Sequence, residues 1–124
     1  MFTTQASTIT KVNATDTVAV SNLGINQVGF GSATIVNMTG YSKIWLFMRG
    51  ANSGVQSGTV TVYVYDYTGS ANLVSLTFSD TSVQFRSATA SISLSGLHKI
   101  QIQAKSSVAT DDPVFGDISV MIEK

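Results

Sequence analysis

The 124-residue sequence contains no cysteine, one histidine and one proline. Without cysteine the chain can form no disulfide bond, no thiolate metal site and no cysteine nucleophile. A chain of this length does not need disulfides, because folding buries about two-thirds of its unfolded surface. We therefore expect residues 1–124 to form a single domain that is stabilised by its own hydrophobic core.

Charged residues are also scarce: they make up 11% of the chain, whereas about 25% is typical of soluble domains. Seven basic and seven acidic side chains cancel, and no stretch gathers lysine and arginine. Nucleic-acid binding depends on basic residues that release counterions from phosphates, and polybasic segments attract anionic lipids. The sequence therefore predicts no nucleic-acid partner and no basic membrane-binding patch.

The chain also lacks hydrophobic segments of the kinds that target or cross membranes. Residues 1–7 show neither the basic start nor the apolar run of a signal peptide. No apolar stretch approaches the ~18 residues of a transmembrane helix, so we expect no membrane insertion.

In place of charges, serine and threonine supply about a quarter of the chain. Hydroxyl and amide groups must therefore cover much of the surface. Such a surface is typical of a virion or extracellular protein, or of one largely buried in an assembly. It also suits an ordinary β protein with a neutral surface.

Apolar and polar residues alternate with a period of two along nearly the whole chain, which predicts strands rather than helices. Gly29 and Gly31 predict a β-bulge in the third strand. Turn residues recur about every 8 to 12 positions, as in sandwiches and barrels. The predicted strands are Ser7–Val12, Thr17–Val20, Gln27–Val36, Ser42–Arg49, Gly58–Tyr67, Leu73–Phe78, Val83–Arg86, Thr89–Ser95, Lys99–Lys105 and Ile118–Ile122.

We expect an all-β fold, an antiparallel two-sheet β-sandwich that is jelly-roll-like, with roughly 8–10 strands. In six strands one face is apolar and the other is polar, the pattern of antiparallel sheets with one face in water. The predicted core residues are Ile44, Leu46, Met48, Val60, Val62, Val64, Val74, Leu76, Phe78, Ala90, Ile92, Leu94, Ile100, Ile102, Ala104, Ile118, Val120 and Ile122.

Two strands carry large aromatic residues on the face opposite the predicted core. An exposed aromatic face usually marks a binding or assembly site. Alternatively, a loop or the N-terminal segment Phe2–Ile9 covers this surface, or the two faces are assigned the wrong way round. The candidate interface or ligand residues are Lys43, Trp45, Phe47 and Arg49 in one strand, and Tyr63, Tyr65 and Tyr67 in the other.

Residues that could support catalysis or metal binding are few. His98 begins a strand and is expected to be hydrogen-bonded at the sheet rim, because no serine lies in a nucleophile-elbow context. Asp111 and Asp112, with Asp117 nearby, form the only acidic cluster, and their spacing predicts a turn before Pro113 rather than a calcium loop. We expect no catalytic residue, no metal, no cofactor and no enzyme activity.

Two segments could accept an N-linked glycan, Asn13-Ala14-Thr15 and Asn37-Met38-Thr39. Chance alone would produce between one and two such triplets in a chain this rich in serine and threonine. They therefore do not indicate export.

The stretch Gly96-Leu97-His98-Lys99-Ile100-Gln101-Ile102-Gln103-Ala104 resembles a late strand of carbohydrate-binding modules, with Gly116-Asp117-Ile118-Ser119-Val120 as its terminal partner. The low charge, the composition and the strand layout resemble jelly-roll domains of icosahedral virion proteins, of the capsid, turret or spike type. Neither resemblance transfers a functional residue.

The virion resemblance implies a non-enzymatic structural module that assembles with virion subunits or with copies of itself, as a homo-oligomer. The alternative is a carbohydrate-binding module. In that case Trp45, Tyr63, Tyr65 and Tyr67 would supply the aromatic platform on which sugar rings stack, and a glycan would be the partner.

Overall fold

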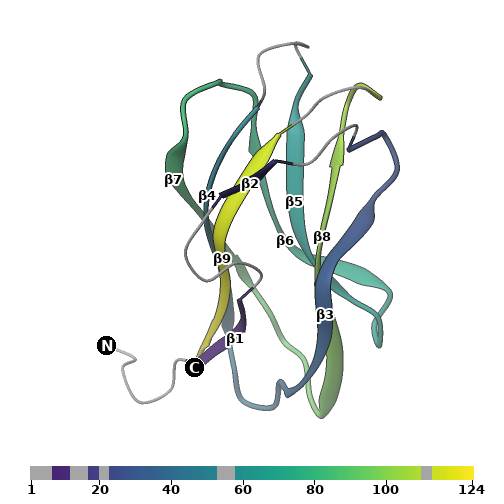
Figure 1. Ribbon diagram of the computed structural model, residues 1–124. Coiled ribbons are helices and arrows are strands. Elements are labelled where there is room, and N and C mark those ends of the chain that lie inside the picture. The colour runs from purple at the N-terminus through teal and green to yellow at the C-terminus, as the bar shows by residue number, and fades with distance from the viewer. Residues whose placement is uncertain (1–6, 12–16, 20–22, 53–57, 110–112) are drawn as a thin grey trace.

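The computed structural model describes residues 7–11, 17–19, 23–52, 58–109 and 113–124. These residues form nine strands in two facing layers (Figure 1). None of them belongs to a helix that could cross a membrane. The strands are β1 (Ser7–Lys11), β2 (Thr17–Ala19), β3 (Val28–Asn37), β4 (Lys43–Ala51), β5 (Val60–Asp66), β6 (Ala71–Phe78), β7 (Gln84–Ser91), β8 (Leu97–Ser106) and β9 (Val114–Glu123).

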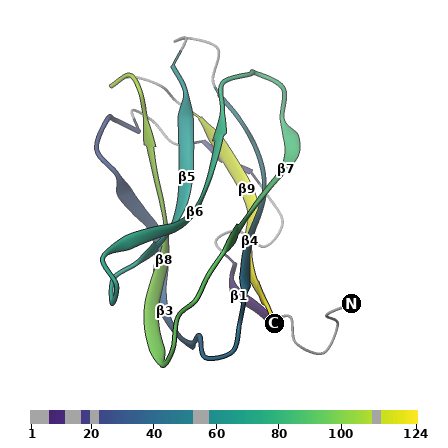
Figure 2. The same cartoon turned by 180° about the vertical axis from the view of Figure 1, so that it is seen from behind.

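The strand order confirms the predicted jelly-roll sandwich. Sheet A has the order β1-β9-β4-β7, and β2 pairs with β9 further along the same strand. Sheet B has the order β3-β8-β5-β6, and every pairing is antiparallel. If β1 and β2 count as one interrupted strand, each sheet has four strands, as in an eight-stranded jelly roll. Seen from behind, β7 forms the outer border of sheet A (Figure 2).

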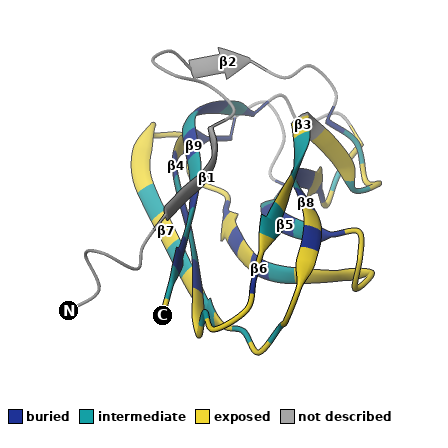
Figure 3. Cartoon of the chain, turned by 90° about the horizontal axis from the view of Figure 1, so that it is seen from below, coloured by how far each residue is buried: buried dark blue, intermediate teal, exposed yellow. Residues whose placement is uncertain are grey.

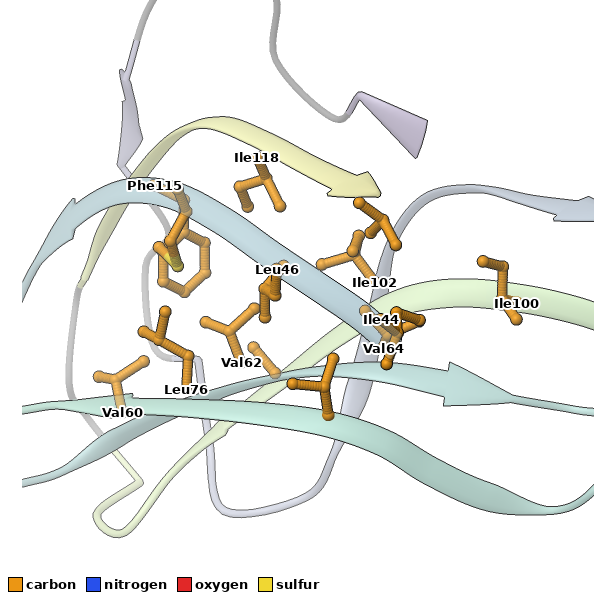
Figure 4. Packing of buried hydrophobic residues seen from close by; sticks show 14 of the residues in the cluster. Ile44, Leu46, Val60, Val62, Val64, Leu76, Ile100, Ile102, Phe115 and Ile118 are labelled. Carbon is orange, nitrogen blue, oxygen red and sulfur yellow. The ribbon is translucent and has the colours of Figure 1, made fainter. Parts of the chain in front are cut away.

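The core lies between the sheets, where the predicted alternation places it. Exposed and buried residues alternate over residues 97–100 of β8 (Figure 3). Ile44 and Leu46 of β4 face the valines of β5, and all of these side chains are fully buried (Figure 4). Burial of one such side chain contributes about 1.5–3 kcal/mol. The predicted Ala90, Ile92 and Leu94 are only partly buried and pack on the edge of this core.

A bulge in β9 explains why one core residue escaped prediction. Asp117 has a φ of 49°, and the register between β4 and β9 shifts between Phe47 and Arg49. The extra residue reverses the alternation, so that Phe115 and Ile118 both face the core. Strict alternation from Ile118 would place Phe115 outside. Leu23, Met38 and Ala51 are also buried, although they lie in loops or at a strand end.

Two other sequence predictions can be compared directly with the strands. The bulge predicted near Gly29 and Gly31 is confirmed, because the register between β3 and β8 shifts between Phe30 and Thr34. The prediction of separate strands at Val83–Arg86 and Thr89–Ser95 is wrong. β7 runs without interruption from Gln84 to Ser91, because each of its residues pairs in register with β4 and no glycine or proline interrupts it.

Candidate functional site

The two aromatic clusters lie on opposite sides of the sandwich. Trp45 and Phe47 project from the outer face of sheet A, whereas Tyr63 and Tyr65 project from the outer face of sheet B. The predicted faces are therefore confirmed, since the residues between them are buried in the shared core. The expectation that Trp45 joins the tyrosines in one platform is wrong, because β4 and β5 belong to different sheets.

On sheet A, three aromatic rings form a row across two strands. The Trp45 and Phe47 rings are 5.8 Å apart with an interplanar angle of 1°, and the Phe47 and Phe85 rings are 6.1 Å apart at 21°. Parallel rings at such separations are offset-stacked, so they partly cover each other's faces. Trp45 Nε1 donates a hydrogen bond to Glu123 Oε1 at 2.8 Å. Phe85, which is 67% exposed, ends the row and was not among the predicted site residues.

The cations predicted to bracket this row are at its ends. Arg49 lies 3.6 Å from the carboxylate of Asp117, and both side chains are partly exposed. Lys43 is exposed and is paired in register with Glu123. An exposed ion pair such as Arg49–Asp117 contributes about 0–1 kcal/mol to stability.

The outer face of sheet B carries a network of amide and phenol groups. Gln103, only 8% exposed, donates from Nε2 to Tyr67 Oη at 3.1 Å and to Gln101 Oε1 at 3.1 Å. The Tyr67 hydroxyl donates to Gln101 Oε1 at 2.6 Å. Gln27 Nε2 donates to Gln103 Oε1 at 2.7 Å and to Asn72 Oδ1 at 2.8 Å. These bonds fix the orientations of the carboxamides relative to one another, because exchange of oxygen and nitrogen in any one of them alone would bring like groups together.

The contact between Gln27 and Asn72 shows that this face is curved. Gln27 directly precedes the edge strand β3, and Asn72 lies in the opposite edge strand, β6. Neighbouring strands are about 4.8 Å apart, so these edges would be about 14 Å apart in a flat sheet. A direct hydrogen bond requires the two edges to bend toward each other over the outer face. Figure 3 shows β3 and the β5–β6 hairpin projecting to the same side of β8.

A glycine on β3 makes room for the network. A Cβ atom at Gly29 would lie 2.4 Å from Oε1 of Gln101, well inside contact distance. The Gln101 carboxamide therefore rests directly against the backbone of β3. Any larger residue at position 29 would force this carboxamide to move.

Several groups on this face keep hydrogen-bonding capacity toward solvent. Among the described residues, none bonds to the hydroxyl of the half-buried Tyr63 or Tyr65. Asn72 Nδ2 makes one bond, to Gln27 Oε1 at 3.3 Å, and carries a second proton. The Tyr65 and Tyr67 rings meet edge to face at 5.0 Å, and Lys99 Nζ lies 5.5 Å from the centre of the Tyr67 ring. Aromatic surface and unfilled donor and acceptor positions therefore lie side by side.

His98 is buried in a separate polar cluster near one end of the sandwich. Its Nδ1 is 2.7 Å from Asp66 Oδ2, and its Nε2 is 3.2 Å from the backbone oxygen of Ser95. Both ring nitrogens therefore have a polar partner within hydrogen-bonding distance. The expected hydrogen-bonded histidine is confirmed, although it is more buried than a rim position implies. In a catalytic triad one histidine nitrogen faces the orienting acid and the other faces the hydroxyl of the nucleophile. In this protein the second nitrogen, His98 Nε2, faces the backbone oxygen of Ser95 instead.

The remaining candidates are the acidic residues and the asparagines of the two glycosylation triplets. Within the described residues, no three histidine or acidic side chains converge as metal ligands would. Asp111, Asp112 and Asn13 lie outside the described residues. Asn37 ends β3, and its side-chain oxygen accepts a hydrogen bond from the N–H of Thr39.

No family model matches the chain, and no curated protein matches it. Among solved structures, the chain is similar to part of a structure of the CBM22-1 and GH10 modules of Clostridium thermocellum endo-1,4-beta-D-xylanase 10B complexed with xylohexaose. The sequence identity is 13% and the TM-score is 0.44, with 88% of this chain and 25% of that chain covered. This likeness is too distant to indicate a function.

Proposed function

We propose that the outer face of sheet B binds a neutral glycan and that the protein is a carbohydrate-binding module without catalytic activity. The observation that carries this proposal is the fixed network of Gln27, Asn72, Gln101 and Gln103 beside Tyr65 and Tyr67. It combines oriented amide groups with aromatic rings on a curved surface.

The chemistry of this face suits a sugar better than a cationic ligand. Carboxamides both donate and accept, as sugar hydroxyls do, and tyrosine rings can pack against the apolar C–H faces of sugar rings. Asp66 is the only acidic residue in the four strands of sheet B, and its side chain is buried. A network that is already oriented loses little conformational entropy when a ligand binds.

Truncation of the network should weaken binding to soluble neutral polysaccharides. We expect Tyr65→Ala and Asn72→Ala each to raise the dissociation constant about tenfold, through loss of ring contact and of a hydrogen-bonding group. Isothermal titration or affinity electrophoresis with xylan, glucan and mannan measures this. Phe85→Ala, on the opposite face, is the matched control and should leave binding unchanged. If no neutral polysaccharide binds, or if only Phe85→Ala weakens binding, the proposal is wrong.

Gly29→Ala tests whether the orientation of Gln101 matters. The added methyl group would displace the Gln101 carboxamide, so we expect weaker glycan binding by a protein that still folds. Ser32→Ala, also on β3 and exposed, is the control. Equal affinity for the Gly29→Ala variant and the wild type would show that the network does not contact the ligand.

The interpretation as an assembly module, including a virion component, stays a prediction. The features that favour self-association lie on sheet A, where the exposed Phe85 belongs to the edge strand β7. They are independent of the proposed glycan face, so one protein could have both properties.

A further inference from the structure

The edge of sheet A at β7 differs from the other sheet edges. Edge strands present unpaired backbone groups to other chains unless bulges, prolines or charges protect them. The pairings of β1, β3 and β6 with their neighbours all contain a register shift, and β2, whose pairing has none, is only 3 residues long. The pairing of β7 with β4 has none over eight residue pairs.

The backbone groups that β7 presents outward follow from the register. The Ile92 N–H bonds to the Ser42 oxygen at 2.9 Å, one step beyond the Lys43–Ser91 pair. Hydrogen-bonded and open pairs alternate in an antiparallel ladder. The even-numbered residues of β7 therefore bond to β4, and the odd-numbered residues direct their N–H and C=O groups away from it. These are Phe85, Ser87, Thr89 and Ser91, and no described residue bonds to their outward backbone groups.

The side chains of β7 do little to protect this edge. The strand has no proline, no lysine and no acidic residue, and Arg86 is its only charge. The Arg86 guanidinium contacts groups of its own subunit and does not extend from the edge. It lies 2.6 Å from the Asp80 carboxylate and 4.5 Å from the centre of the Phe78 ring. Its Nε donates a hydrogen bond to the Gly50 oxygen. Its side chain is only 15% exposed.

We propose that β7 pairs antiparallel with β7 of a second copy of this chain, around a twofold axis that passes beside Ala88. In this register Ser87 faces Thr89 of the partner subunit, and Phe85 faces Ser91 of the partner subunit. All four outward-directed residues then form hydrogen bonds, and sheet A continues across both copies.

The register favours a second copy over an unrelated chain because β7 is complementary to itself. Arg86 falls opposite Ala90 of the partner subunit, so no like charges meet. The side chains of Ser87, Thr89 and Ser91 are small, so the two β7 strands can approach each other closely. The exposed Phe85 ring is then partly buried against the partner subunit. A single pair of strands buries little surface, so the dimer is weak and concentration-dependent.

Sedimentation equilibrium of the wild type and of Ser87→Pro tests this pairing. Proline removes an N–H that the monomer does not use, so the fold should persist while the dimer loses two hydrogen bonds. We expect the dimer dissociation constant to rise about tenfold or more, with an unchanged circular dichroism spectrum. Ala88→Pro is the matched control, because it removes an N–H that bonds to β4, and it should lower the thermal midpoint instead.

A cysteine cross-link tests the register without weakening the edge. The chain has no cysteine, so any disulfide in Ala88→Cys joins two copies. Open pairs bring Cα atoms within about 4.5 Å, inside the range for a disulfide. We expect covalent dimers from Ala88→Cys and none from Thr77→Cys, on the exposed face of β6.

Three outcomes would overturn the proposal. One is a wild type that stays monomeric up to about 1 mM, a concentration at which even weak dimers form. The second is a dimer that Ser87→Pro leaves intact, and the third is equal cross-linking from both cysteine variants. A monomer whose β7 edge instead captures an extended peptide would assign the edge to another protein and not to a second copy.

Discussion

Replacing His98 by alanine should lower the free energy of unfolding by about 1–3 kcal/mol, because it leaves the buried Asp66 side chain without its hydrogen-bond partner. Asp66 is 1% exposed and lies 2.7 Å from His98 Nδ1. Its other oxygen accepts the N–H of Thr68, which does not reach the oxygen that faces His98 Nδ1. The loss should appear as a lower denaturant midpoint with an unchanged slope.

The matched control for His98→Ala is Lys99→Ala, the exposed neighbour, which should change stability by about 0.5 kcal/mol or less. The double variant with Asp66→Ala should lose less than the sum of the two single losses, because neither polar group then stays buried without its partner. A loss of under about 1 kcal/mol for His98→Ala would show that the pair contributes little.

Phe115→Ala should destabilise the sandwich by about 3–5 kcal/mol, the usual cost of a large cavity in a core. Phe115 is 2% exposed, and its ring meets that of Phe78 edge to face at 6.3 Å. Phe85→Ala removes the same atoms from a ring that is 67% exposed, so it should cost far less. Chemical denaturation of the two variants side by side measures the difference.

Similar losses for the two phenylalanine variants would contradict the inward position of Phe115. They would also remove the argument for the Asp117 bulge, because only the reversed alternation brings Phe115 into the core.

Residues in regular strands were predictable from the sequence because their position follows from a period of two. Ile44, Leu46 and Met48 alternate without a break, and so do Val60, Val62 and Val64, and all are buried. The alternation also placed Trp45 and the tyrosines on outer faces. It could not show that these faces belong to different sheets, since strand order depends on pairings between distant segments.

The amide network was beyond sequence reasoning for a physical reason. Gln101 and Gln103 could be recognised as polar residues on the outer face of β8, between Lys99 and Lys105. Gln27 and Asn72, however, come from segments 45 residues apart and meet only because the edges of sheet B bend together. The Gly29 contact with Gln101 depends on the same curvature. Phe85 was overlooked because the strand that carries it was predicted to be short.

The binding face can be identified most directly by following backbone amide resonances while a soluble neutral oligosaccharide is added to isotopically labelled protein. Our account predicts concentration-dependent shifts at residues 63–67, 101–103, Gln27 and Asn72 on sheet B, with Trp45, Phe47 and Phe85 on sheet A unaffected. Shifts confined to sheet A, or none with any neutral oligosaccharide at millimolar concentration, would contradict the proposal that sheet B binds a glycan.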